Sequence, residues 1–179
     1  MNAHALRVLE YDKALELVAR YAATEPGRER VRSVLPSVSP EIVSDRLREA
    51  AEFLRILREG EQPPFEGVRA IAPLLEKLSV TGLTLQPAEL LAIGSTLGAA
   101  RRIKAFFRRI EERPVSGSQD HAPVLCSRAG RMIVLKDAED AISTAVDETG
   151  EVKDSASPEL RRLRKLIGRT RDDILDRMN

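Results

Sequence analysis

A heptad pattern of apolar residues runs along a helix that is predicted to begin after Ser39. Ser39-Pro40-Glu41 combines a capping hydroxyl, a first-turn proline and an acid suited to the positive end of a helix, and Gly60 is a natural stop. Between them the apolar residues follow spacings of four, three, four and three: Val43, Leu47, Ala50, Leu54 and Leu57. This spacing places them on one helix face and predicts a packing seam.

Caps, prolines and apolar periodicity predict further helices along most of the chain. The expected ranges are 13–24 with Asp12 as its N-cap, 25–35, 40–59, 69–78, 87–110, 122–129, 137–147, and 158 to the end. The helix after Pro87 carries an apolar stripe formed by Ile93, Leu97, Ala100, Ile103, Phe107 and Ile110. Gly94 and Gly98 lie within it and would allow another helix to approach closely. In the helix over 137–147 the residues expected to point inward are Ala138, Ile142, Ala145 and Val146.

Composition agrees with this helical pattern. Aromatic residues make up 3% of the chain, tryptophan is absent and charged residues reach 32%, which favours long amphipathic helices over a sandwich or barrel. We therefore expect an all-α bundle of six to eight helices. Its expected parts are a helical core over 1–112, an irregular connection with a short helix over 113–135, and a final part over 136–179.

Three local features refine that outline. The Met132–Leu135 run fits either a short buried strand or the end of a helix, and its periodicity does not choose between them. Residues 147–157 are expected to be a connector loop, in which Asp154 and Ser155 satisfy backbone groups. The last helix has no stop signal, and we expect it to be a long helix cut within its length.

The motifs of several enzyme classes are missing from the sequence. It contains no G-x-x-x-x-G-K-[ST] phosphate loop, no H-E-x-x-H and no C-x-x-C. Cys126 is the single cysteine and is interpreted as a small buried residue, while His4 and His121 are far apart. We therefore expect no catalytic, cofactor-binding or metal site and no enzyme activity. Neither a signal peptide nor a membrane span is visible, so a cytoplasmic location is expected.

Charge is balanced at +1 overall but gathers locally. The basic cluster of the last helix contains Arg161, Arg162, Arg164, Lys165, Arg169 and Arg171. A second cluster contains Arg101, Arg102, Lys104, Arg108 and Arg109. Both are candidate contacts for a nucleic-acid phosphate backbone. The alternative for both is the solvated face of a helix, where cations near the C-terminus are stabilising in any case.

Several segments, taken in order, resemble a known family. These segments are Leu9–Lys13, Tyr21–Arg28, Phe65–Arg69, Gln86–Ile93, Ala99–Arg102 and, as the most specific, Ala145–Leu160. In this order they resemble the type-two MutS proteins, which are bacterial paralogues of the mismatch-repair ATPase MutS. The resemblance extends over nearly the whole chain and is weakest over 113–135.

That resemblance implies that this chain is a fragment of a larger, multidomain protein. The family begins with a helical core or lever region, sends long helices out to a clamp, and continues with a dimerising ATPase domain that binds ATP and Mg²⁺. A C-terminal Smr endonuclease domain follows. Family members are linked to branched-DNA binding, suppression of homologous recombination and ribosome rescue, which makes DNA and rRNA the implied partners. This chain would be about the first quarter of a homodimeric protein, and its last helix would lead toward the clamp.

Two other functions remain open on the residues alone. One is an autonomous nucleic-acid-binding module that uses the basic clusters. The other is a helical dimerisation domain that uses the apolar stripe of the last helix.

Overall fold

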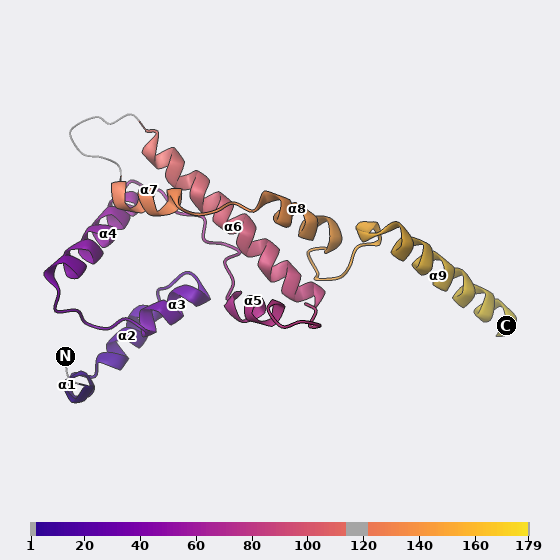
Figure 1. Ribbon diagram of the computed structural model, residues 1–179, viewed down its shortest axis with the longest axis horizontal. Coiled ribbons are helices and arrows are strands. Elements are labelled where there is room, and N and C mark those ends of the chain that lie inside the picture. The colour runs from indigo at the N-terminus through magenta and orange to yellow at the C-terminus, as the bar shows by residue number, and fades with distance from the viewer. Residues whose placement is uncertain (1–2, 114–121, 179) are drawn as a thin grey trace. The chain divides into compact units, whose positions relative to one another are not determined.

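The computed structural model describes residues 3–113 and 122–178, and all of its named elements are helical (Figure 1). The α-helices are α1 (Ala3–Val8), α2 (Tyr11–Ala19), α3 (Glu25–Arg32), α4 (Pro40–Arg58), α5 (Ala72–Leu78), α6 (Pro87–Glu111), α7 (Pro123–Gly130), α8 (Lys136–Ala145) and α9 (Pro158–Met178), with a 3₁₀ turn, η1, at Asp154–Ala156. One isolated antiparallel bridge joins Val146 to Val152. The prediction of an all-α fold is confirmed.

Hydroxyl caps begin three of the helices, and the cap at Ser39 confirms the prediction made from the sequence. Thr24 Oγ1 accepts a hydrogen bond of 3.1 Å from the Gly27 amide at the start of α3. Ser39 Oγ accepts one of 3.4 Å from Ile42 at the start of α4. Ser157 Oγ accepts one of 3.0 Å from Leu160 at the start of α9. Each cap satisfies an amide that has no partner within its own helix.

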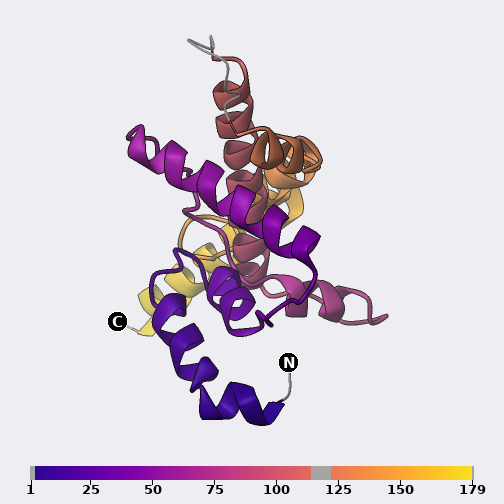
Figure 2. The same ribbon diagram turned by 90° about the vertical axis from the view of Figure 1, so that its left-hand side faces the viewer.

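The N-terminal helices differ from the prediction. Helix α1 was not expected, and α1 to α3 follow one another as short helices ahead of the longer α4 (Figure 2). Asp12 is not an N-cap: α2 begins at Tyr11, and the capping position is Glu10, in the left-handed region at φ 51°. Asp12 lies in the first turn of α2 instead, where a carboxylate still faces the positive end of the helix.

The Met132–Leu135 run is neither a strand nor the end of a helix. It is an irregular segment between α7 and α8, and Ile133 is 77% exposed. Lys104 Nζ donates a hydrogen bond of 2.7 Å to the Met132 carbonyl, which supplies a partner that a sheet would otherwise provide. The remainder of the irregular connection expected over 113–135 lies partly outside the described residues, at 114–121.

The chain divides into two compact units. Unit 1 comprises residues 1–70 and 98–134, and unit 2 comprises residues 71–97 and 135–179, so both units contain part of α6. The division into consecutive parts 1–112, 113–135 and 136–179 stays a prediction.

The core of unit 1 gathers around the C-terminal half of α6. Its buried members come from α4, α6, α7 and the residue before α7: Ile56, Phe106, Phe107, Ile110, Ala122, Cys126 and Ala129. The Phe106 and Phe107 rings meet edge to face with centroids 5.2 Å apart, an arrangement that aromatic pairs favour. Cys126 is 5% exposed and burial raises the pKa of its thiol. The interpretation of Cys126 as a buried structural residue is therefore confirmed.

Unit 2 contains two close approaches that glycine permits. A Cβ on Gly94 of α6 would lie 2.9 Å from Cγ2 of Ile142 on α8, so the expected helix approach at this glycine is confirmed. Gly150 has φ 83°, and a Cβ there would lie 3.3 Å from Cα of Ala88. In α8, Ile142 and Ala145 are half-buried, whereas Ala138 is exposed, contrary to the prediction.

The predicted seam of α4 is not buried by the described residues. Its large members are between 37% and 65% exposed: Val43, Leu47, Leu54 and Leu57. Helix α4 instead buries Glu52 and Ile56. At 100° per residue these two side chains lie on the side away from the seam. The seam prediction was therefore wrong for packing within this chain. Helix α4 packs with its opposite face, which includes the buried acid Glu52.

Candidate nucleic-acid interface

Helix α9 concentrates four cations on one face. The spacings of Arg161, Arg162, Lys165 and Arg169 place them within about 100° of the helix circumference and over roughly 12 Å of its axis. All four are exposed. Together with Pro158 and Leu166 they line one shallow surface depression. Such a face can contact several phosphates of one nucleic-acid backbone.

The other two members of this basic cluster have different surroundings. Arg164 Nη1 donates a hydrogen bond of 2.9 Å to the Val152 carbonyl and also pairs with Asp154. Asp154 was expected to satisfy backbone groups, but its structural partner is this guanidinium. Arg171 borders the apolar stripe of α9, next to Ile167 and Ile174. The six predicted residues therefore separate into a cationic face of four and two residues outside it.

Acidic residues follow the four cations on the same face of α9, toward its C-terminus. At helical spacing, Asp172, Asp173 and Asp176 fall on the same side of α9 as the four cations. All three are exposed. The face is thus cationic in its first half, residues 161–169, and anionic in its second half, which would repel phosphate.

The second basic cluster has contacts within the protein. Arg102 donates to the Glu66 carbonyl at 2.7 Å, and Lys104 donates to the Met132 carbonyl at 2.7 Å. Arg108 pairs with Glu112 at 3.3 Å. Arg101 is half-buried and also takes part in an interaction. Arg102 and Lys104 thus join α6 to other segments of unit 1, so they are less suited to a phosphate ligand than the exposed cations of α9.

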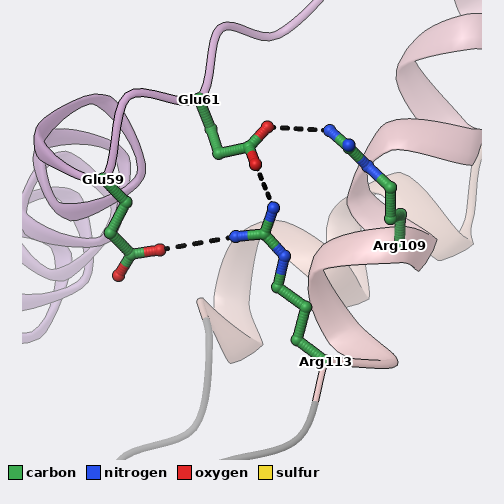
Figure 3. A network of polar contacts seen from close by, with 4 residues as sticks. All are labelled: Glu59, Glu61, Arg109 and Arg113. Atoms are coloured by element: carbon green, nitrogen blue, oxygen red, sulfur yellow. Dashed lines mark hydrogen bonds and ion pairs between the residues drawn. The ribbon is translucent and has the colours of Figure 1, made fainter.

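Arg109, the remaining member of that cluster, belongs to a network around Glu61 (Figure 3). Glu61 accepts hydrogen bonds from Arg109, at 2.7 Å, and from Arg113, while Arg113 also pairs with Glu59 at 3.7 Å. Arg109 additionally lies over the Phe106 ring, 5.4 Å from its centroid. The Arg113 guanidinium, and then that of Arg109, hold the pKa of the Glu61 carboxyl below its usual value. The network ties the end of α4 to the end of α6.

The buried carboxylate of Glu52 makes another connection between helices, which the sequence did not indicate. Glu52 of α4 is 6% exposed and accepts backbone hydrogen bonds from Val124, at 3.2 Å, and Leu125, at 2.9 Å. These amides lie in the first turn of α7, whose capping residue Ala122 has φ 59° and offers no side-chain cap. Glu52 therefore caps α7 from another helix. Because more than 70 residues separate these partners, no local pattern could have indicated the contact.

The connector between α8 and α9 is an ordered turn. Asp147 Oδ1 accepts hydrogen bonds from the Thr149 amide, the Thr149 hydroxyl and the Glu151 amide, at 2.9, 2.7 and 2.9 Å. These donors, the Thr149 hydroxyl first, lower the pKa of the Asp147 carboxyl. The isolated Val146–Val152 bridge closes the turn. Asp147 therefore supplies the acceptor for two amides and one hydroxyl of the connector.

Neither a metal site nor a membrane span is found in the described part of the chain. Over residues 3–113 and 122–178 no group of three His, Cys, Asp or Glu side chains is placed to hold a metal ion. No helix in these ranges is both long enough and apolar enough to span a membrane.

Comparison with known proteins places this helical segment among MutS-like proteins. The chain is 34% identical over 179 residues to the protein named endonuclease MutS2 of Halothermothrix orenii, 36% identical over 182 residues to that of Exiguobacterium sibiricum, and 35% identical over 179 residues to that of Clostridium perfringens. These alignments cover 97–100% of the chain but 22% of each relative. The chain belongs to the MutS2 family and spans about a fifth of its relatives' length. No family model matches it.

Proposed function

We propose that this chain is the N-terminal core and lever region of a MutS2-type DNA-processing protein and that it performs no catalysis itself. In this role it transmits movements of an ATPase domain to a DNA clamp. The observation that carries the proposal is similarity along the whole chain to proteins named endonuclease MutS2, of which the chain spans 22%.

The packing of unit 1 supports a mechanical role. Three cross-connections link elements that are distant in sequence: Glu61 with Arg109 and Arg113, Glu52 with the start of α7, and Glu49 with Arg128. Cross-links of this kind oppose independent movement of α4, α6 and α7. A group of helices that moves as a rigid body can transmit a displacement from one end to the other with little reduction in its amplitude.

The chemistry of the complete protein would lie elsewhere in the polypeptide. The sequence has no phosphate loop, so ATP and Mg²⁺ would be held by residues outside these 179. Endonuclease activity, dimer formation, branched-DNA recognition and any ribosomal role belong to this proposal at the level of the full-length protein.

The test asks whether the Glu61 network is needed for DNA to stimulate ATP hydrolysis. In the full-length protein, Glu61→Gln with Arg113→Gln should reduce the stimulation of ATP hydrolysis by DNA while basal hydrolysis is retained. The isolated 179-residue chain should hydrolyse neither ATP nor DNA. Hydrolysis by the purified chain, or unchanged stimulation in a variant shown to lack the network, would contradict the lever role.

A second candidate function is phosphate-backbone binding by α9. The observation favouring it is the exposed face formed by Arg161, Arg162, Lys165 and Arg169. Replacing all four with Gln should weaken binding of branched DNA or rRNA fragments. The slope of log K against log salt should flatten by up to about 0.9 for each phosphate that is no longer neutralised. The matched control replaces four exposed arginines of unit 1: Arg20, Arg28, Arg30 and Arg131. Equal weakening in both variants would show a general charge effect and would contradict a specific site.

A further inference from the structure

Helix α4 packs one face against unit 1, and its opposite, apolar face is not covered by the described residues. The inward face buries Ile56 in the core of unit 1. The outward face is the heptad seam of Val43, Leu47, Ala50, Leu54 and Leu57, all of which are exposed. From Val43 to Leu57 the seam is roughly 21 Å long at 1.5 Å per residue. An exposed apolar strip of this length and regularity suits the apolar seam of another helix.

The charges beside the seam indicate what kind of helix fits. Arg46 and Arg58 lie about 60° to either side of the seam, at the positions that flank a coiled-coil contact. Arg46 donates to the Leu35 carbonyl at 3.2 Å, and its side chain remains on the surface. The acids Asp45, Glu49 and Glu52 lie on the far side of α4. The seam is therefore flanked by positive charge alone, which complements a helix with acids beside its apolar residues.

We propose that the α4 seam docks an amphipathic helix whose apolar face is bordered by acids, and that this helix belongs to the part of the MutS2 polypeptide outside these 179 residues. The chain spans 22% of its relatives, so about four fifths of their length is available to supply the helix. The inference rests on family membership and does not require the lever role.

Other occupants fit the charges less well. The apolar stripe of α9 is bordered by Arg164 and Arg171 on one side and by Glu159, in its first turn, on the other, so most of its border would face the arginines of α4 with like charge. A second copy of α4 brings no acid beside its own seam, so Arg46 and Arg58 would gain no partner from it.

The first experiment tests whether the α4 seam prefers a helix flanked by acids. Two designed 21-residue helical peptides share one heptad seam of leucines and differ only in flanking residues, Glu in one and Lys in the other. Fluorescence anisotropy with the 179-residue chain should give roughly tenfold tighter binding for the Glu peptide. The Arg46→Glu and Arg58→Glu double variant should reverse that preference. Equal binding of both peptides, or an unreversed preference, would overturn the proposal.

The second experiment tests whether the docking helix belongs to the rest of the full-length polypeptide. The rest of the full-length polypeptide, expressed without residues 1–179, should bind the chain in trans, and Leu47→Asp with Leu54→Asp should abolish that binding. Val38→Asp, at an apolar residue 89% exposed before α4, is the control and should bind normally. Circular dichroism checks that all variants are folded. Retained binding by the Leu47 and Leu54 variant overturns the proposal, as does sedimentation showing a dimer that the same substitutions dissociate.

Discussion

Glu52 of α4 caps α7 through the amide of Leu125, which donates a hydrogen bond of 2.9 Å to its carboxylate. The carboxylate is nearly removed from solvent, and a second amide, that of Val124, donates to its other oxygen. The start of one helix thus depends on a side chain of another helix. This dependence can be measured.

Replacing Glu52 with Ala should lower the free energy of unfolding by about 1–3 kcal/mol, because two half-buried amides lose their acceptor. Glu49→Ala is the matched control, one turn earlier on α4. Glu49 pairs with an exposed arginine, Arg128, so its removal should cost less than about 1 kcal/mol. Urea denaturation followed by circular dichroism gives both values. Similar destabilisation of the two variants would contradict the capping role.

Gly94→Ala should destabilise unit 2 although alanine favours helices. The added Cβ would lie 2.9 Å from Cγ2 of Ile142, and overpacking of this kind costs about 1–3 kcal/mol. Gly168→Ala in α9 is the control, because a Cβ there meets nothing within 4 Å. That variant should gain up to about 1 kcal/mol from helix propensity. Thermal denaturation of both variants tests the pair, and stabilisation by Gly94→Ala would disprove the close approach.

Acid should weaken unit 1 through Glu61. The pKa of this carboxyl lies below its usual value of 4.5 because Arg113, and then Arg109, interact with its charged form. A carboxyl whose pKa is lowered by folding stabilises the protein above its unfolded-state pKa. That contribution disappears as the pH falls through the folded-state value. Below about pH 4.5 the melting temperature of the wild type should therefore fall more steeply than that of Glu61→Gln, and parallel curves would exclude the effect.

Neutralising the acidic half of the α9 face should strengthen nucleic-acid binding. Asp172, Asp173 and Asp176 follow the four cations on the same side of the helix, where they repel the continuing phosphate chain. The triple Asn variant should bind branched DNA several-fold more tightly at low salt, and the gain should shrink as salt screens the charges. Asp137→Asn on α8 serves as control. Unchanged affinity of the triple variant would contradict binding along this face.

The sequence was sufficient where structure depends on neighbouring residues. Ser39 caps the helix that follows it, as predicted, since a capping hydroxyl acts within three residues. The contacts of Glu52 and Glu61 could not be predicted, because each joins positions that only the folded chain brings together. Arg164 was identified as a cation, but its pairing with Asp154 was not foreseen.

The seam of α4 shows a different limit. Heptad spacing identified an apolar face correctly, yet periodicity cannot state which polypeptide covers it. The buried face was harder to recognise because it includes Glu52, an acid that resembles a surface residue until its two amide donors are known.

Helix α6 carries a practical consequence for anyone who wants to shorten this protein. Its residues up to Leu97 belong to one unit and those from Gly98 to the other, and the two units alternate along the chain. No single cleavage can release either unit whole. A protease nick in the helix would disrupt both at once, and separate expression of one unit would require rejoining its two stretches of sequence with a new linker.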